Sequence, residues 1–526
     1  MKRIILFFAF SIFSFYSFSQ SIVYVDAAAG GANDGSSWTN AYRHLSSALA
    51  AANAGNDIDT IFIAKGTYYP TGDQSGTNRD SAFLLLRGNL FLYGGFDPAN
   101  GITDIAQRNI QPYGGTGTIL SGNINNPADS LDNCWHVMVI ATYTNDLGKI
   151  LLDGVTIREG NGTMSPGGYK YYGSGPGRPY GYYGAGGGML ITSASTQIRM
   201  RNVVVSNNVT QGIHSRRFLD MENCSVVSNI APGGDENSTT HFAVFGGGLY
   251  CLEGLKLKHC LVADNQIYYG FVPKGGGIYL EGNLDMEECI VRDNTVLDAA
   301  GCSPLVGVGG GGGIYAHGYA LIKNSEITGN AYTVVLGCVW DGEFRRYRYG
   351  GGGGLALNSN TEIVNSIIAF NSISGGMVPA GAFRRFAGGG IMMMDNAGVK
   401  LVNSIIYGNT DPIGAAISAV DNSYSIPVNI GNSVILSNSS LFSPEITVTR
   451  FHSLVQGFNS TTDGNLDASA GGTVFTNAAG GDFSLPAGSV LINKGNNNLY
   501  NSAAYPDADM NSNNRVSGGV LHIGPY

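Results

Sequence analysis

Short apolar runs enclosed by asparagine recur through the middle of the chain. A seven-residue unit (asparagine, small residue, two apolar residues, two variable residues, asparagine) occurs eight times with some substitutions, as in NSIIAFN from Asn365 and NSIIYGN from Asn403. The closing residue returns at intervals of 21 to 41 residues, at Asn208, Asn229, Asn265, Asn294, Asn330, Asn371, Asn409 and Asn438. A constant unit at variable intervals predicts repeated rungs that carry loops of variable length.

A glycine cluster followed by apolar residues precedes most of these units. Glycine permits positive φ and close backbone approach, so the clusters are expected where the chain turns a corner. They lack the Lys-Ser/Thr that follows in phosphate-binding loops, and their recurrence favours a structural role. The six clusters begin at Gly186, Gly246, Gly275, Gly311, Gly352 and Gly388.

These patterns predict an all-β fold, a right-handed single-stranded parallel β-helix in which each short strand pairs with the next turn. The asparagines would stack as a ladder of side-chain amides, which satisfies polar groups inside the coil. Cys224, Cys260 and Cys289 share the second position of the unit with several serines, so we expect small stacked residues there. The seven cysteines include no CxxC pair, and we expect mostly buried free thiols with at most one disulfide.

The chain divides into four segments. Residues 1–20 have the pattern of a cleaved signal peptide, and residues 21–145 contain the N-terminal cap and the first turns. The helical, Ala-rich spacing of residues 38–53 predicts a helix that caps the open end of the coil. Residues 146–440 hold the repeated rungs, and residues 441–526 hold the last turns and a closing segment.

Location and partners follow from the same features. The signal peptide predicts a secreted protein, extracellular or on the outer cell surface. No later segment has the roughly 20 apolar residues of a membrane span. A formal net charge of −9 argues against nucleic acid as a partner. We expect a monomer.

Several segments resemble known secreted proteins. The glycine cluster with a downstream asparagine resembles the repeats of polymorphic outer membrane proteins. The opening IVYVDAAAGGANDGSSW and the closing DADMNSNNRVSGGVLHIGPY are similar to the choice-of-anchor Q domain of the pectin lyase-like superfamily. The resemblance implies a surface or secreted β-helix protein, often of undefined activity. Many relatives carry a C-terminal sorting domain, absent up to Tyr526, so we expect a released protein or a longer chain.

Clusters of arginine and aromatic residues are the candidate ligand-binding sites. Aromatic rings stack on sugar faces and guanidinium groups bind carboxylate or sulfate, so these clusters predict an anionic polysaccharide as ligand. The structural alternative is that the rings cover the coil and the arginines neutralise nearby acidic residues. The candidates are Arg345, Arg346, Tyr347 and Arg348; Arg384, Arg385 and Phe386; Arg216 and Arg217; and Arg178 and Tyr180.

Three functional hypotheses compete. The first is a non-catalytic, adhesin-like protein that binds a polysaccharide or surface partner, and another is a purely structural surface or matrix component without a small ligand. The second is a polysaccharide lyase, in which an arginine of these clusters removes a proton and a tyrosine acts as acid. A glycoside hydrolase is less favoured, because it needs clustered carboxylic acids and only Asn409-Thr410-Asp411 matches part of a polygalacturonase motif.

An alternation of acidic and amide residues near the C-terminus has the spacing of a calcium loop. It consists of Asp507, Asp509, Asn511 and Asn513, without the glycine and closing glutamate of such loops. Ca²⁺ is therefore a weak candidate here, and we expect no other cofactor. Asp264 and Asp293, one turn apart, are expected to be solvated turn residues.

Overall fold

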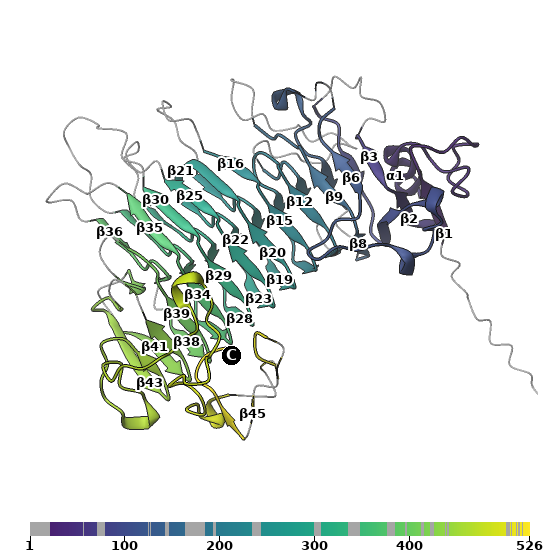
Figure 1. Ribbon diagram of the computed structural model, residues 1–526. Helices are drawn as coiled ribbons and strands as arrows, with labels where there is room; N and C mark the ends of the chain where they lie inside the picture. The colour runs from purple at the N-terminus through teal and green to yellow at the C-terminus, as the bar shows by residue number, and fades with distance from the viewer. Residues whose placement is uncertain are drawn as a thin grey trace, which may run out of the picture.

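The computed structural model describes most of the chain after the predicted signal peptide. The described residues are 21–526 except 56, 71–78, 125, 127, 143–146, 164–184, 193–195, 234–242, 299–306, 335–347, 376–383, 395–396, 412–414, 421–424, 437, 439–440, 501–504, 506–507, 512, 514–515 and 518. In Figure 1 they form a long rod of stacked strands, with the N-terminal turns at one end.

Three parallel sheets run along the rod, and each strand pairs with its counterpart one turn later. Sheet A contains β1 (Ser21–Val25), β2 (Ile58–Ala64), β5 (Leu90–Phe96), β8 (Lys149–Asp153), β11 (Gln197–Arg201), β14 (Leu219–Glu222), β19 (Gly254–Lys258), β23 (Asn283–Glu287), β28 (Ala320–Lys323), β33 (Thr361–Val364), β38 (Val399–Val402), β41 (Ile426–Gly431) and β43 (Ile446–Phe451). Sheet B contains β3 (Gly66–Tyr68), β6 (Thr118–Ser121), β9 (Thr156–Arg158), β12 (Val204–Ser206), β15 (Ser225–Val227), β20 (Leu261–Ala263), β24 (Ile290–Arg292), β29 (Glu326–Thr328), β34 (Ile367–Ala369), β39 (Ile405–Tyr407), β42 (Val434–Leu436) and β44 (Leu454–Val455). Sheet C contains β4 (Phe83–Leu85), β7 (Met138–Ile140), β10 (Met189–Ile191), β13 (Ile213–Ser215), β18 (Leu249–Cys251), β22 (Ile278–Leu280), β27 (Ile314–Ala316), β32 (Leu355–Leu357), β37 (Ile391–Met393) and β40 (Ile417–Ala419). The predicted right-handed parallel β-helix is confirmed.

The seven-residue unit forms sheet B and the two bends that enclose it. Asn403 has φ 51° and Gly408 has φ 62°, and the three-residue strand β39 lies between these two left-handed residues. Asparagine and glycine adopt this conformation at the least cost, which explains their place in the unit. The two apolar residues of the unit have different surroundings: Ile406 belongs to the central core, whereas Ile405 lies in a second cluster outside sheet B.

The predicted ladders are present. The Asn330 Nδ2 donates to Asn371 Oδ1 at 2.9 Å, and Asn294 Nδ2 donates to Asn330 Oδ1 at 2.9 Å. The second positions also stack, since the Cys289 backbone N–H donates to Ser325 Oγ at 3.1 Å. The five described cysteines are buried and free, namely Cys134, Cys224, Cys251, Cys260 and Cys289. Burial raises the pKa of Cys134 to about 12, and these thiols pack as small core residues.

The glycine clusters form the bend into sheet C, as predicted. The first glycine of the fourth cluster, Gly311, has φ 72°. A Cβ on the third, Gly313, would meet the Asn330 side chain at 3.0 Å, so the ladder itself excludes a larger residue there.

A fourth set of strands projects between sheets B and C, and we call it the flange. Its strands are continuous with the loops that follow the asparagine ladder, and Figure 1 shows them along one edge of the rod. The flange contains β16 (Ile230–Pro232), β17 (Ala243–Phe245), β21 (Gln266–Lys274), β25 (Thr295–Asp298), β26 (Gly307–Gly310), β30 (Ala331–Val334), β31 (Arg348–Gly351), β35 (Ser372–Gly375) and β36 (Arg384–Ala387).

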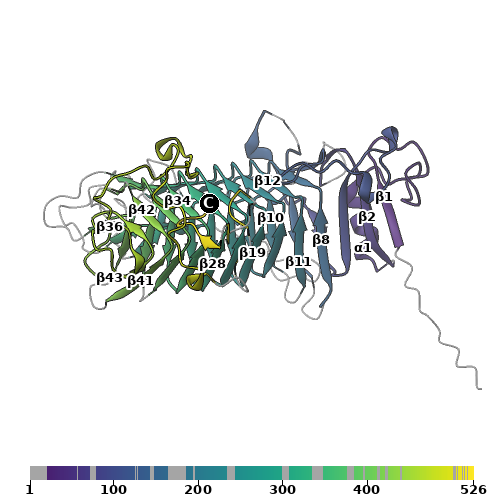
Figure 2. The same ribbon diagram turned by 60° about the horizontal axis from the view of Figure 1, so that its bottom comes forward.

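The two ends of the chain close the rod differently. The helix α1 (Leu45–Asn53) buries Leu45, Ala48, Leu49 and Ala52 against the first turns, so the predicted capping helix exists but begins at Leu45 rather than near Trp38. The segment after β44, which includes the hairpin β45 (Val516–Ser517) and β46 (Val520–Leu521), returns over sheets A and B (Figures 1 and 2). No helix among the described residues is long and apolar enough to cross a membrane.

Candidate functional site

The flange carries three of the arginines that the sequence singled out, namely Arg348, Arg384 and Arg385. The strands β31 and β36 pair in parallel, with Arg348 opposite Arg384 and Tyr349 opposite Arg385. The two similar sequence motifs align Arg345 with Arg384, so the observed register differs from that alignment by three residues. Cationic and aromatic residues of two successive turns are therefore neighbours across the flange strands, about 4.8 Å apart.

Other predicted binding residues lie outside the described part of the chain. These are Arg345, Arg346 and Tyr347, which precede β31, and Arg178 and Tyr180 in the segment before β10. Phe386 belongs to β36, opposite Gly350.

Arg216 and Arg217 lie at a different corner of the coil. They follow β13 and precede β14, so they occupy the bend from sheet C to sheet A, whereas the flange enters sheet C from the other side. The Arg217 guanidinium pairs with the Glu253 carboxylate, and the backbone N–H of Phe218 donates to Glu253 at 3.3 Å. This pair of arginines therefore lies apart from the arginines of the flange.

A stack of rings runs along the outer face of sheet C. His214 stacks on Tyr250 with centroids 4.3 Å apart, and Tyr279 and Tyr315 continue the stack at 5.1 and 5.4 Å. In-register strands repeat at nearly this distance, so rings at one strand position stack naturally. The Lys274 ammonium, at the end of β21, lies 4.5 Å from the Tyr315 ring centroid and joins the flange to this stack. Burial lowers the pKa of His214 to about 3, so this ring is neutral at physiological pH.

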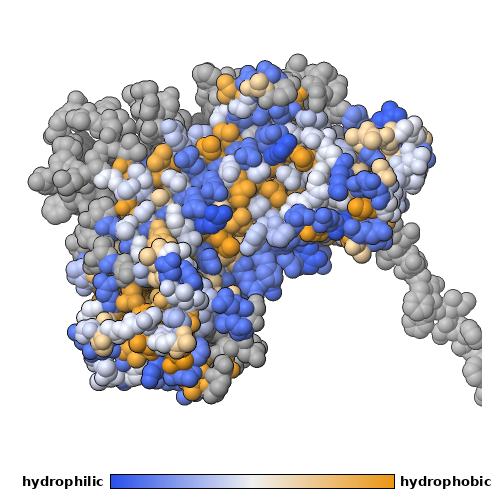
Figure 3. Space-filling view, in the orientation of Figure 1, coloured by the Kyte–Doolittle hydropathy of each residue, from blue (hydrophilic) through white to orange (hydrophobic). Residues whose placement is uncertain are grey.

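The outer face of sheet B is covered at one end and open in the middle. Ile367 and Ile405 are 3% and 0% exposed, because the C-terminal segment packs on them. Leu261 and Ile290, at the equivalent positions of β20 and β24, are only partly buried. We call the outward residues of β20, β24 and β29 the open face. Figure 3 shows hydrophobic patches in the middle of the rod on the side that Figure 1 presents.

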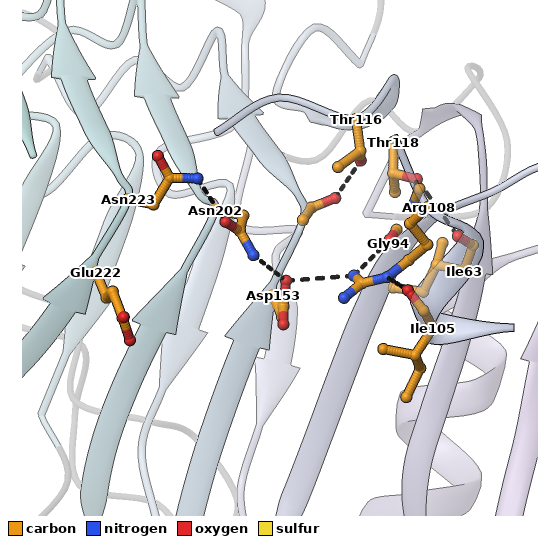
Figure 4. A network of polar contacts seen from close by, with 12 residues as sticks. Ile63, Gly94, Ile105, Arg108, Thr116, Thr118, Asp153, Asn202, Glu222 and Asn223 are labelled. Carbon is orange, nitrogen blue, oxygen red and sulfur yellow. Dashed lines mark hydrogen bonds and ion pairs between the residues drawn. The ribbon is translucent and has the colours of Figure 1, made fainter. Parts of the chain in front are cut away.

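A loop from the N-terminal turns forms one wall of the open face. Figure 4 shows how it is held: Arg108 forms a buried ion pair with Asp153 at 3.2 Å, and Asn202 donates to the same carboxylate at 2.7 Å. Asn223 extends this series of polar contacts by donating a hydrogen bond to Asn202 at 2.6 Å. The Asn223 side chain also accepts from the backbone N–H of Tyr113 at 2.8 Å. Tyr113 has φ 59°, which is uncommon for an aromatic residue.

Glu326 is the acidic group of the open face. Its strand β29 pairs with β24, and Glu326 lies beside Ile290. Burial raises the pKa of this carboxyl, and no described cation counters the effect. Burial also raises the pKa of Tyr113, and the charge of Glu326 adds to this rise, so the phenol lies near the carboxyl. Burial raises the pKa of Tyr526 to about 12, with Glu326 again contributing.

Glu326 is not among the site residues that the sequence predicted. A signal was present, because Glu326 occupies the first apolar position of NSEITGN, where the other units have Val, Ser, Leu or Ile. Tyr113 and Tyr526 lie far from Glu326 in the sequence and carry no comparable signal.

The weak calcium candidate forms a turn. Asp509 Oδ1 accepts from the backbone N–H groups of Asn511 and Asn513, both at 2.8 Å, and Asp507 lies outside the described residues. Asp264 and Asp293 adopt left-handed conformations at the bend after sheet B, and Asp293 pairs with Arg292 at 2.6 Å. No cluster of three or more His, Cys, Asp or Glu suited to a metal occurs among the described residues.

Comparison with known proteins gives structural neighbours only. No family model matches the chain, and no curated protein matches it. The chain is similar to the crystal structure of the pectate lyase Pel9A, with 14% identity and a TM-score of 0.41, over 97% of this chain and 96% of that one. It is also similar to the catalytic domain of a GH87 alpha-1,3-glucanase, with 13% identity and a TM-score of 0.28, over 82% of this chain and 68% of that one. No function is transferred from either.

Proposed function

We propose that this protein is a secreted or cell-surface β-helix that binds an anionic polysaccharide through its flange, in the manner of an adhesin. The observation that carries the proposal is the register of β31 and β36, which brings Arg348 opposite Arg384 and Tyr349 opposite Arg385. The resemblance to polymorphic outer membrane proteins and to the choice-of-anchor Q domain agrees with a surface role. Release from the cell and a monomeric state remain part of the proposal.

The physical argument rests on charge and spacing. Arginines at paired strand positions carry like charges, and a ligand with repeated carboxylates or sulfates neutralises these charges while accepting paired hydrogen bonds. The chain as a whole carries a formal charge of −9, so a local cationic group on the flange selects where an anionic chain binds.

A binding panel tests the proposal. The purified protein is titrated with pectate, alginate, chondroitin sulfate and neutral glucans, each at low and high salt. We expect binding of at least one anionic polysaccharide, weakened by salt, and no binding of the glucans. Equal affinity for neutral and anionic chains would contradict it.

The alternative function is a polysaccharide lyase acting on the same ligand class. The pairing of Tyr349 with Arg385 favours it, because a lyase needs a base and a proton donor beside the uronate. The same incubations distinguish the two: unsaturated uronate would establish the lyase, and reducing ends without unsaturation would indicate hydrolysis. Binding without product supports the hypothesis of a non-catalytic binding protein.

A further inference from the structure

We infer that the open face of sheet B is a second binding site, for a segment of glycan that contains a free amino sugar. The protonated amine would pair with Glu326, and the sugar ring would lie on Leu261 and Ile290. Tyr113 and Tyr526 flank it. This inference does not rest on the proposed role of the flange, because the two sites lie on different strands and differ in charge.

The negative charge of Glu326 favours a cationic ligand. Glu326 is half-buried, and a carboxylate removed from water without a partner is costly. Two basic groups of the neighbouring turns are already engaged: Arg292 pairs with Asp293 at 2.6 Å, and the His259 ring contacts the Glu288 carboxylate. An incoming ammonium would give Glu326 the counter-ion that these groups do not supply.

The remaining surroundings of the carboxyl also favour a cation. Asp482 and Asp509, from the C-terminal segment, contribute to the raised pKa of Tyr526, so that end of the open face is acidic as well. Tyrosine rings attract ammonium groups through their electron-rich faces, and Tyr113 and Tyr526 both lie near Glu326.

The floor of the open face, formed by Leu261 and Ile290, favours a ligand that has an apolar ring face. Leu261 and Ile290 are in register on adjacent strands and are partly exposed, so they form a flat apolar surface beside the carboxyl. A pyranose ring presents one apolar face and carries its amine at the edge. It can therefore contact the floor and reach Glu326 at once, with little conformational entropy to lose.

The conformation of Tyr113 is consistent with a site. A bulky residue with φ 59° is strained, and it is held there by the hydrogen bond to Asn223. The chain of contacts from Arg108 through Asp153 and Asn202 fixes Asn223 in turn. The backbone of Tyr113 is thus fixed in position before any ligand arrives.

The test compares two sugars of the same length. The full-length protein is titrated by calorimetry with a glucosamine tetramer and with an N-acetylglucosamine tetramer, which lacks the amine charge. We expect the glucosamine tetramer to bind at least about tenfold more tightly, the scale of one charge-assisted contact. Equal binding of both, or no binding of the glucosamine tetramer, would overturn the inference.

Two variants and a competitor complete the design. Glu326→Gln should weaken binding of the glucosamine tetramer by about tenfold or more, whereas Glu287→Gln, on the outer face of sheet A, should leave it unchanged. Thermal melting establishes that both variants fold. Spermidine should bind much more weakly, because it lacks a ring for the floor. Retained binding by Glu326→Gln, or equal binding of spermidine, would rule out an amino sugar held by this carboxyl.

Discussion

The Tyr505 hydroxyl donates a hydrogen bond to the Glu362 carboxylate across 143 residues of sequence. Lys400 pairs with the same carboxylate from the adjacent strand β38, and the Tyr319 hydroxyl donates to it at 3.4 Å. This cluster fastens the C-terminal segment to sheet A. On sheet B, the same segment covers Ile367 and Ile405. The closing segment is therefore a clasp that joins two faces of the rod.

The clasp should weaken in acid. Burial alone would raise the pKa of Glu362, but hydrogen bonds from Lys400, Tyr505 and Tyr319 outweigh it and hold the pKa below its usual value. A depressed folded-state pKa means that stabilisation is present above the unfolded value of about 4.3 and is lost as pH falls through the folded value. Tyr505→Phe should reduce the free energy of docking by about 1 kcal/mol at neutral pH. Hydrogen exchange of the segment measures this, and an unchanged rate would contradict the clasp.

The two isoleucines of one unit should respond differently to a buried charge. Ile406→Asp places a carboxylate in the central core and should prevent cooperative folding of the adjacent turns, a loss of several kcal/mol. Ile405→Asp should instead release the C-terminal segment while the rod stays folded. Limited proteolysis with mass analysis distinguishes these outcomes. Identical fragments from both variants would contradict the assignment of Ile406 to the inner face and Ile405 to the outer face of sheet B.

The asparagine ladder should make a measurable contribution to stability. Asn330→Ala removes the acceptor for the Asn294 backbone N–H, bonded at 3.1 Å, and for the Asn294 side chain. A buried donor left unpaired costs about 1–3 kcal/mol, so the free energy of unfolding should fall by at least that amount. Denaturant titration measures it, with the exposed Asn498→Ala as control. A change no larger than in the control would argue against the ladder.

Glu326 should destabilise the unliganded protein at neutral pH. Burial raises its folded-state pKa, so its contribution is fully favourable only below the unfolded value of about 4.3 and is lost as pH rises through the folded value. Glu326→Gln should therefore raise the Tm at neutral pH and have little effect at low pH. Scanning calorimetry at both pH values tests this. A lower Tm for the variant at neutral pH would mean that the carboxylate has a partner.

The repeat predicted the coil because its signals are local. Asparagine and glycine with positive φ, and a strand of three residues, recur within a few positions, as at Asn403 and Gly408. The open face was not predictable, because Tyr113 and Tyr526 approach Glu326 only when the N-terminal loop and the C-terminal segment pack on the rod. The register of the flange strands could not be predicted from the sequence either. Loop lengths between β31 and β36 shift the paired residues by three positions relative to the motif alignment.

The affinity of the flange for pectate tests most directly whether the flange binds an anionic polysaccharide. Dissociation constants are measured for the wild type, for Arg348→Ala/Arg384→Ala/Arg385→Ala, and for Arg199→Ala/Arg201→Ala, whose arginines pair with Asp220 and Glu222 on the outer face of sheet A. We expect the flange variant to lose about tenfold or more in affinity and most of its salt dependence, and the sheet A variant to bind as the wild type does. Equal losses in both variants, or none in the flange variant, would contradict a polysaccharide site on the flange.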